Sequence, residues 1–158
     1  MKIGLFAGSF DPFTNGHYEI AKKALKICDK LLICIGDNEC KKRTFDKSKM
    51  ISAINQTFAK EIESNKIEVY EYSGLTGDFA IKANANFLIR GIRDVKDYIN
   101  EEEIASFNLK AFNLETIYLR AEPNAQHISS SIIREMLKNN LDVSPYLPAT
   151  VLNAIKLI

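Results

Sequence analysis

The sequence predicts an α/β protein: a five-stranded parallel sheet with helices on both faces. Two observations predict it. Short apolar runs alternate along the chain with longer segments in which apolar residues recur at helical spacing. Several of the short runs are continuously apolar, as is typical of strands covered on both faces. Because parallel strands need a crossover, the repeated order of strand and helix predicts a parallel sheet.

The first half of the chain shows the pattern clearly. The apolar run Lys2–Ala7 predicts a buried first strand, and Tyr18–Cys28 predicts a helix. The apolar residues at helical spacing in that helix are Ile20, Ala21, Ala24, Leu25 and Cys28. A second strand is expected at Lys30–Ile35. Asp46 is a suitable N-cap for a helix that ends near Lys60.

The second half repeats the alternation. The expected strands there are Ile67–Tyr72, Asn86–Ile89 and Thr116–Leu119, and the expected helices are Leu75–Ala85, Asp94–Asn113, Ser129–Lys138 and a last one from Pro148 to Ile158. The fourth strand is expected to end just before Arg90. For the long helix we expect one buried face, made of Tyr98, Ile104, Ala105, Phe107, Leu109 and Phe112.

Length and composition limit the class of protein. With 158 residues, we expect one domain spanning residues 1–158. The net charge of +1 gives no basic field for nucleic acid, so no nucleic-acid partner is expected. No apolar run could cross a bilayer, no signal-peptide pattern opens the chain, and three cysteines lack C-x-x-C spacing. We therefore expect a reduced, cytoplasmic protein without a membrane partner, in which Cys28 and Cys34 are small core residues.

The stretch from Gly8 to His17 carries the first functional signal. It lies between the first strand and the first helix, which places Gly16 and His17 near a helix N-terminus, where free N–H groups favour an anion such as phosphate. Gly8 would let the backbone approach a ligand. The stretch is neither a P-loop nor a G-x-G-x-x-G fingerprint. The plainer alternative is an ordinary strand–turn–helix corner in which His17 only caps.

Basic residues follow the second and fourth expected strands. Lys41, Lys42 and Arg43 come after the second, where a solvated loop is the plain alternative. Arg90 and Arg93 flank a glycine after the fourth, and planar guanidinium groups suit phosphate oxygens. Because ligands gather where parallel strands end, this placement favours an anionic ligand.

Serines open the helix expected after the fifth strand. Ser129, Ser130 and Ser131 supply hydroxyl and N–H groups that suit phosphate, although an N-cap alone needs only one of them. No G-x-S-x-G elbow is present, so a Ser-His-Asp nucleophile is not indicated. Positioning and charge stabilisation suffice when one phosphate attacks another.

These motifs resemble known signatures. Thr14-Asn-Gly-His17 is similar to the (H/T)-x-G-H signature of the nucleotidyltransferase superfamily, and Ile128-Ser-Ser with Arg134 is similar to its second signature. The Gly-Ser-Phe-Asp-Pro-Phe lead-in resembles that of the bacterial phosphopantetheine adenylyltransferases, and the resemblance extends over essentially the whole chain. It implies a Rossmann-like nucleotidyltransferase fold and transfer of AMP from ATP to 4'-phosphopantetheine, giving dephospho-coenzyme A and pyrophosphate, without a covalent enzyme intermediate.

The resemblance also implies roles for individual residues. His17 would stabilise the transition state, and Lys41 and Arg90 would orient the acceptor. The residues implied to bind the acceptor are Ser9, Lys41, Thr76 and Arg90. Those implied to bind ATP are Ser9, Phe10, His17, Gly91, Ile92, Arg93, Glu101, Ala125, Gln126, His127, Ile128, Ser129, Ser130 and Ser131. Mg²⁺ would accompany ATP without dedicated protein ligands, the assembly would be a homohexamer, and coenzyme A would act as a feedback inhibitor.

Departures from the family pattern occur at Asn100, Ala125 and His127, where many members have aromatic residues. Two competing functions stay open at this point. One is a sister nucleotidyltransferase acting on nicotinamide mononucleotide or a phosphorylated small alcohol. The other is a nucleotide-binding module without catalysis, which would bind ATP and release no pyrophosphate.

Overall fold

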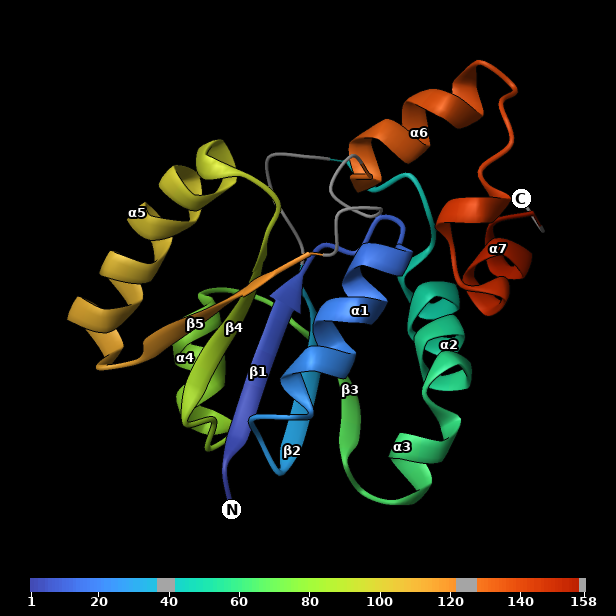
Figure 1. Ribbon diagram of the computed structural model, residues 1–158. Helices are drawn as coiled ribbons and strands as arrows, with labels where there is room; N and C mark the ends of the chain where they lie inside the picture. Colours follow the sequence, from blue (N-terminus) through green and yellow to red (C-terminus); the bar gives the residue numbers. More distant parts are fainter. Residues whose placement is uncertain (37–41, 122–127, 157–158) are drawn as a thin grey trace.

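A computed structural model describes residues 1–36, 42–121 and 128–156. Within them, five parallel strands form one sheet in the order β3-β2-β1-β4-β5 (Figure 1). The strands are β1 Ile3–Gly8, β2 Lys30–Gly36, β3 Ile67–Tyr72, β4 Phe87–Ile92 and β5 Glu115–Arg120. The predicted α/β class and the five-stranded parallel sheet are therefore confirmed.

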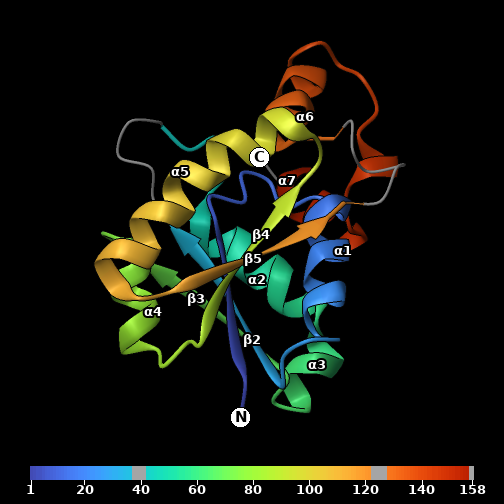
Figure 2. The same cartoon turned by 60° about the vertical axis from the view of Figure 1, so that its left-hand side comes forward.

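Helices cover both faces of this sheet (Figure 2). They are α1 Asn15–Ala24, α2 Lys47–Thr57, α3 Ala59–Glu63, α4 Thr76–Lys82, α5 Val95–Phe112, α6 Ser130–Lys138 and α7 Ala149–Lys156, with a short 3₁₀ turn, η2, at Ser144–Tyr146. α4 and α5 lie on one face, and α1, α2 and α7 on the other. Asp46 caps α2 as predicted, since its carboxylate accepts the N–H of Lys49 at 2.8 Å.

The apolar core is divided unequally between the two faces. The larger cluster, on the face of α1, α2 and α7, includes buried Phe6, Phe13, Ile33, Ile54 and Phe58. The smaller cluster, on the face of α4 and α5, consists of Leu5, Ala7, Leu32, Cys34, Ala80, Ala85, Leu88 and Leu114. Cys28 and Cys34 are buried as predicted, and burial raises the pKa of the Cys34 thiol to about 12, so that it stays protonated.

Several boundaries differ from the sequence prediction. Helix α1 begins at Asn15, three residues earlier than expected, because Thr14 is its N-cap. The helix expected up to Lys60 breaks at Phe58, whose fully buried ring anchors the chain between α2 and α3. Strand β4 continues to Ile92, because its ladder with β5 extends that far. Arg90 therefore lies inside a strand rather than after one.

The expected buried face of the long helix is wrong for four of its members. In α5, Tyr98, Ile104, Phe107 and Leu109 are 41%, 51%, 50% and 43% exposed, and Asn108 is the buried residue of the helix. The apolar residues are spread around the helix, and the small cluster beneath it covers only part of its circumference.

No helix in the described residues is long and apolar enough to span a membrane.

Candidate active site

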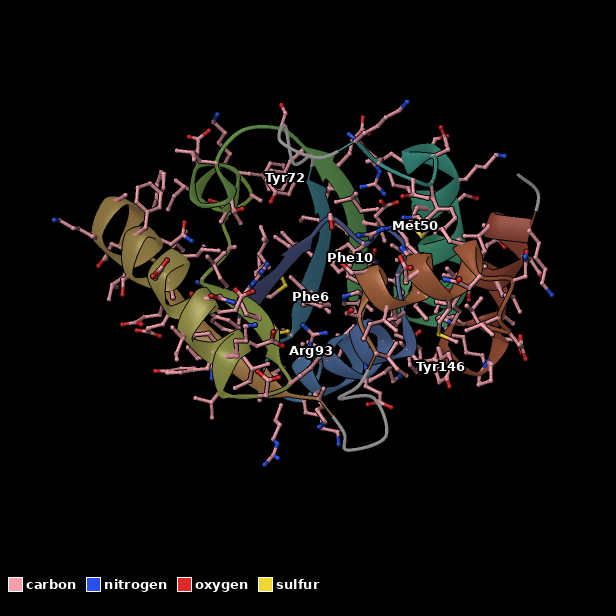
Figure 3. The ribbon with its side chains drawn as sticks, turned by 90° about the horizontal axis from the view of Figure 1, so that it is seen from above. Phe6, Phe10, Met50, Tyr72, Arg93 and Tyr146 are labelled. Atoms are coloured by element: carbon pink, nitrogen blue, oxygen red, sulfur yellow. The ribbon has the colours of Figure 1, made fainter. Side chains whose placement is uncertain are left out.

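A cavity of about 570 Å³ opens at the carboxyl ends of the strands. It lies where the strand order reverses, because the chain runs from β1 outward to β3 and then returns to β4 on the other side of β1. Figure 3 looks down on this edge and shows Phe6, Phe10 and Arg93 together between α5 and α6, with Tyr72 on the other side of the sheet. The cavity is lined by the ends of β1 and β4, the β1–α1 loop, residues 42–43 and the starts of α1, α5 and α6.

His17 lies at the floor of this cavity in the first turn of α1. It forms a capping box with Thr14: the His17 N–H donates to the Thr14 hydroxyl, and the Thr14 N–H donates to His17 Nδ1 at 2.9 Å. An Nδ1 that accepts a backbone N–H carries no proton in the neutral ring, so the proton of the neutral ring is on Nε2. The capping box thus fixes the tautomer of His17.

Three phenyl rings surround the imidazole of His17. The ring centroids of Phe10, Phe13 and Phe6 lie 5.0, 5.4 and 6.3 Å from its own. Desolvation of the ring and, to a smaller extent, the positive charges of Arg93 and Arg90 together lower the pKa of His17 to about 3. At neutral pH the imidazole is therefore uncharged and offers a single N–H donor at Nε2.

Arg90 is held in place by three hydrogen bonds from its guanidinium. Its Nε and Nη2 donate to the carboxylate of Glu101 on α5 at 2.5 and 2.6 Å, and its Nη1 donates to the carbonyl of Ala7 at 2.5 Å. The side chains of Arg90 and Glu101 are only partly exposed, at 28% and 18%. The bidentate geometry orients the guanidinium at the rim of the cavity.

Arg93 makes a second pair of this kind with Asp97 at the start of α5. Its Nε and Nη2 donate to the two oxygens of Asp97 at 2.6 and 2.9 Å. This ion pair keeps the pKa of the Asp97 carboxyl below its ordinary value. Arg93 therefore forms a partly exposed salt bridge and also lines the cavity.

At two glycine positions of the site, packing also leaves no room for a side chain. A Cβ at Gly91 would lie 2.9 Å from the side chain of Ile20, so the glycine lets α1 pack closely on β4. A Cβ at Gly8 would lie 2.8 Å from the ring of Phe10. Gly8 and Gly91 both line the cavity, whereas Ile92 is outside its lining among the described residues.

The three serines at the start of α6 have three different partners. Ser129 is the N-cap and accepts the N–H of Ile132 at 3.1 Å, Ser130 donates to the carbonyl of Pro12 at 2.8 Å, and the Ser131 hydroxyl accepts from Arg134 at 3.1 Å. All three line the cavity, as does Ile128. Capping therefore explains Ser129 alone, and Ser130 joins α6 to the β1–α1 loop.

A second cavity, of about 440 Å³, adjoins the first on the side of α4 and α5. The residues common to both linings are Ala7, Gly8, Ser9, Arg90 and Glu101. Thr76 lines the second cavity, and its hydroxyl lies 2.8 Å from that of Tyr72. Ser9 and Arg90 therefore stand at the junction of two compartments, one large enough for a nucleotide and the other for a slender second ligand.

The model of the cytidylyltransferase-like family matches residues 5–136. The phosphopantetheine adenylyltransferase of Phocaeicola vulgatus is 45% identical over 148 residues, which is 94% of this chain and 96% of that protein. This chain belongs to the phosphopantetheine adenylyltransferase family. Enzymes of the same name from Bacteroides thetaiotaomicron and Fusobacterium nucleatum are 42% and 36% identical, and the matches cover 94% and 96% of this chain and 96% and 93% of those proteins.

The fold has a more distant likeness among solved structures. A bifunctional NMN adenylyltransferase/ADP ribose pyrophosphatase from Francisella tularensis, complexed with AMP and a Mn ion, superposes with a TM-score of 0.67 at 16% identity. The match covers 92% of this chain and 44% of that one. At this identity it shows the shared fold alone, which agrees with the Rossmann-like fold predicted for a phosphopantetheine adenylyltransferase.

The structure brings most of the predicted family residues together. Ser9, Phe10, His17, Gly91, Arg93, Glu101, Ile128 and the three serines line the first cavity, Thr76 lines the second, and Arg90 lines both. Lys41, Ala125, Gln126 and His127 lie outside the described residues. Lys42 and Arg43, which follow Lys41, line the first cavity.

The sequence analysis assigns no role to three charged residues that line the cavity: Asp11, Asp97 and Arg134. The i,i+4 spacing of Arg93, just before an expected helix, and Asp97, in its first turn, is an available signal for Asp97. Arg134 stands in the quoted second signature, but no role was assigned to it. No local pattern marks Asp11, because the residues whose N–H groups it accepts lie 33 and 34 positions away in the sequence.

Proposed function

We propose that this protein transfers the adenylyl group of ATP to 4'-phosphopantetheine, reversibly, with dephospho-coenzyme A and pyrophosphate as products. The observation that carries the proposal is the neutral, partly buried His17, which has its proton on Nε2 and lines a cavity that Arg90 and Arg93 also line. Such a site suits a polyphosphate that gains charge during reaction. The 45% identity to an enzyme of this name supports the choice of acceptor. We regard residues 1–158 as one catalytic domain.

The two cavities suggest where each substrate binds. The first has the arginines and the serine-rich start of α6, so it would hold the triphosphate of ATP. The second has Thr76 and apolar lining such as Leu5 and Ile104, so it would hold the acceptor's chain. The acceptor phosphate would then reach the α-phosphorus at the junction, beside Ser9 and Arg90.

The reaction requires no protein nucleophile. With both substrates oriented, an oxygen of the acceptor phosphate attacks the α-phosphorus in line, and pyrophosphate leaves. The Nε2–H of His17 would donate to the α- or β-phosphate oxygens, where charge gathers in the transition state. Arg90 and Lys41 would orient the acceptor phosphate. In the bonds to the described residues, Nη1 and Nη2 of Arg90 each use one of their two N–H groups, which leaves the second for this purpose.

Mg²⁺ would enter with ATP. Among the described residues no three His, Cys, Asp or Glu side chains gather as a metal cluster, and the cavity carboxylates of Asp97 and Glu101 pair with arginines. This donor set fits an ion held by phosphate oxygens and water, which is the usual coordination of Mg²⁺ beside a nucleotide. When bound, the ion neutralises part of the triphosphate charge.

We further propose a homohexamer whose interfaces include exposed apolar residues of α5, since Val95, Ile99 and Phe107 are 74%, 57% and 50% exposed. The partners would be small molecules, with coenzyme A as a feedback inhibitor because it shares the product's pantetheine arm. Nucleic acid and membranes are not among the proposed partners.

Pyrophosphate release from Mg-ATP tests the function, with 4'-phosphopantetheine and nicotinamide mononucleotide assayed in parallel. Turnover with phosphopantetheine alone is the expected result. Turnover with nicotinamide mononucleotide instead would keep the adenylyl transfer and overturn the roles of Thr76 and Arg90 toward the acceptor. No release with either acceptor, together with measurable ATP binding, would favour a binding module without catalysis.

A further inference from the structure

The β1–α1 loop and the segment before α2 are joined by hydrogen bonds that run in both directions. The Asp11 carboxylate accepts the backbone N–H of Thr44 at Oδ2 and that of Phe45 at Oδ1, each at 2.9 Å. In return, Arg43 donates from Nη1 to the carbonyl of Ser9 at 2.6 Å. We call this contact between residues 9–11 and 43–45 the loop junction.

Asp11 is the buried centre of the loop junction. Its side chain is only 9% exposed, and the guanidinium groups of Arg43 and Arg134 each approach it to 3.9 Å. Arg134 also donates from Nη1 to the main-chain carbonyl of Asp11 at 2.6 Å. A buried carboxylate needs charge and hydrogen-bond partners, and here both come from elements distant in the sequence.

Arg43 acts on the backbone at the most strained point of the loop. Phe10 has φ +43°, a left-handed conformation that is uncommon for a residue with a bulky side chain. Arg43 donates to the main-chain carbonyls just before and just after the Phe10 Cα, which are those of Ser9, at 2.6 Å, and of Phe10 itself, at 3.5 Å. These bonds hold the turn that places the Phe10 ring against His17, with centroids 5.0 Å apart.

We propose that Asp11 and Arg43 are positioning residues of the active site: the loop junction fixes the Ser9–Phe10 turn, and with it His17, against the segment that begins at Lys42. The effects that we expect on kcat and KM rest on the proposed function. The positioning role is inferred from their partners: both carboxylate oxygens of Asp11 accept backbone N–H groups, and all three guanidinium nitrogens of Arg43 donate to backbone carbonyls. A displacement of about 1 Å at reacting groups can cost roughly 10²-fold in rate.

The first test follows His17 itself, without any substrate. The chain has two histidines, so NMR of histidine-labelled protein gives two imidazole signals, and His17→Gln identifies which one belongs to His17. The three phenyl rings around His17 shift its ring-proton resonances. Arg43→Met and Asp11→Asn should move this signal, because the Phe10 ring is released. An unmoved His17 signal in a folded Arg43→Met variant would overturn the proposal.

The second test separates geometry from charge in the kinetics. Arg43→Met should lower kcat/KM by about 10²-fold, with part of the loss in kcat. Arg43→Lys should be similarly impaired, because an ammonium group cannot bond both carbonyls as the guanidinium does. Recovery of activity in Arg43→Lys would assign Arg43 to charge alone and overturn the positioning role. The double variant Arg43→Met/Asp11→Asn should have about the same kcat/KM as the less active of its two single variants. Additive losses of kcat/KM would contradict a shared junction.

A matched control is the Lys22–Glu61 ion pair, which joins α1 to α3 at 2.6 Å outside both cavities. Glu61→Gln should change thermal stability without moving the His17 signal or the kcat. Equal kinetic losses in Glu61→Gln and Arg43→Met would show a general stability effect and overturn the proposal. Absence of wild-type turnover would refute the proposed function, while the NMR test of the junction would still decide this inference.

Discussion

The two walls of the first cavity hold their functional groups by different means. On the wall of β1 and α1, His17 is enclosed by phenyl rings, and Thr14 and Phe10 are only 1% and 2% exposed. On the wall of β4 and α5, Arg90 and Arg93 are partly exposed, at 28% and 33%, and each is held by a carboxylate. On one wall, a donor is fixed by the capping box and by phenyl rings. On the other, charges are fixed by ion pairs, and an anionic ligand can compete with the carboxylates or share their arginines.

Removal of the buried donor should have the largest effect. His17→Ala is expected to lower kcat by about 10²–10³-fold, the scale for one lost donor to developing charge, with a smaller change in the KM for ATP. The measurement is pyrophosphate release under saturating substrates. His17→Gln should recover part of the loss, because its amide also offers an uncharged N–H. Near-normal kcat in His17→Ala would contradict the role of His17 as a donor in the transition state, and with it the contrast between the two walls.

Replacement of the guanidinium on the opposite wall should have the next largest effect. Arg90→Lys keeps the charge but loses the fork that bonds Glu101 twice and Ala7 once. We expect the KM for the acceptor to rise roughly 10–100-fold, the scale of lost charge-assisted hydrogen bonds, with a smaller change in kcat. Initial rates at varied acceptor concentration measure this. A fall in kcat with unchanged KM would place Arg90 in the chemistry rather than in acceptor binding.

The pH dependence of stability tests the burial of His17 directly. The pKa of its imidazole is about 3 in the folded protein against 6.5 in the unfolded chain. Above pH 6.5 both states are neutral. As the pH falls from 6.5 toward 3, only the unfolded chain binds the proton, so His17 lowers the free energy of unfolding by about 1.4 kcal/mol per pH unit. Urea unfolding at pH 7 and pH 5 should show a steeper loss in the wild type than in His17→Gln. Equal losses would contradict a buried neutral imidazole.

The smallest expected effect comes from the capping box. Thr14→Ala removes the hydroxyl that caps α1 and should lower the free energy of unfolding by about 1 kcal/mol. Thr14→Ser retains the cap oxygen and serves as the control. Urea unfolding at pH 7 measures both. The backbone N–H that Thr14 donates to Nδ1 remains in either variant, so kcat should change less than in His17→Ala, and a larger loss would give the hydroxyl a role in the reaction.

Local patterns predicted the β1–α1 wall well. The signal for the anion site, Gly16-His17 at the start of a helix, depends on residues within a few positions of one another, and the structure places them together. The alternation of apolar strands with helices predicted the parallel sheet for the same reason. The expected roles of the residues toward substrates remain predictions.

Long-range contacts explain what sequence reasoning could not reach. Arg90 was expected after a strand, but pairing with Tyr118 of β5 keeps it inside β4. The buried face expected for α5 failed at Phe107 and Leu109, because periodicity shows which residues are apolar and not how much core lies beneath them. The role of Asp11 could not be predicted, because its hydrogen-bond partners are supplied by a distant segment.

The unequal division of the core has a consequence for local opening of the protein. α5 packs on the small cluster and buries a single residue, Asn108, whereas α2 and α7 share the large cluster. Segments with few buried apolar contacts open at lower free-energy cost, and their amide hydrogens exchange sooner with solvent. In the isolated chain, the amides of α5 should exchange well before those of α2. Local opening of α5 would thus expose the second cavity, which α5 covers, while the wall that holds His17 remains folded.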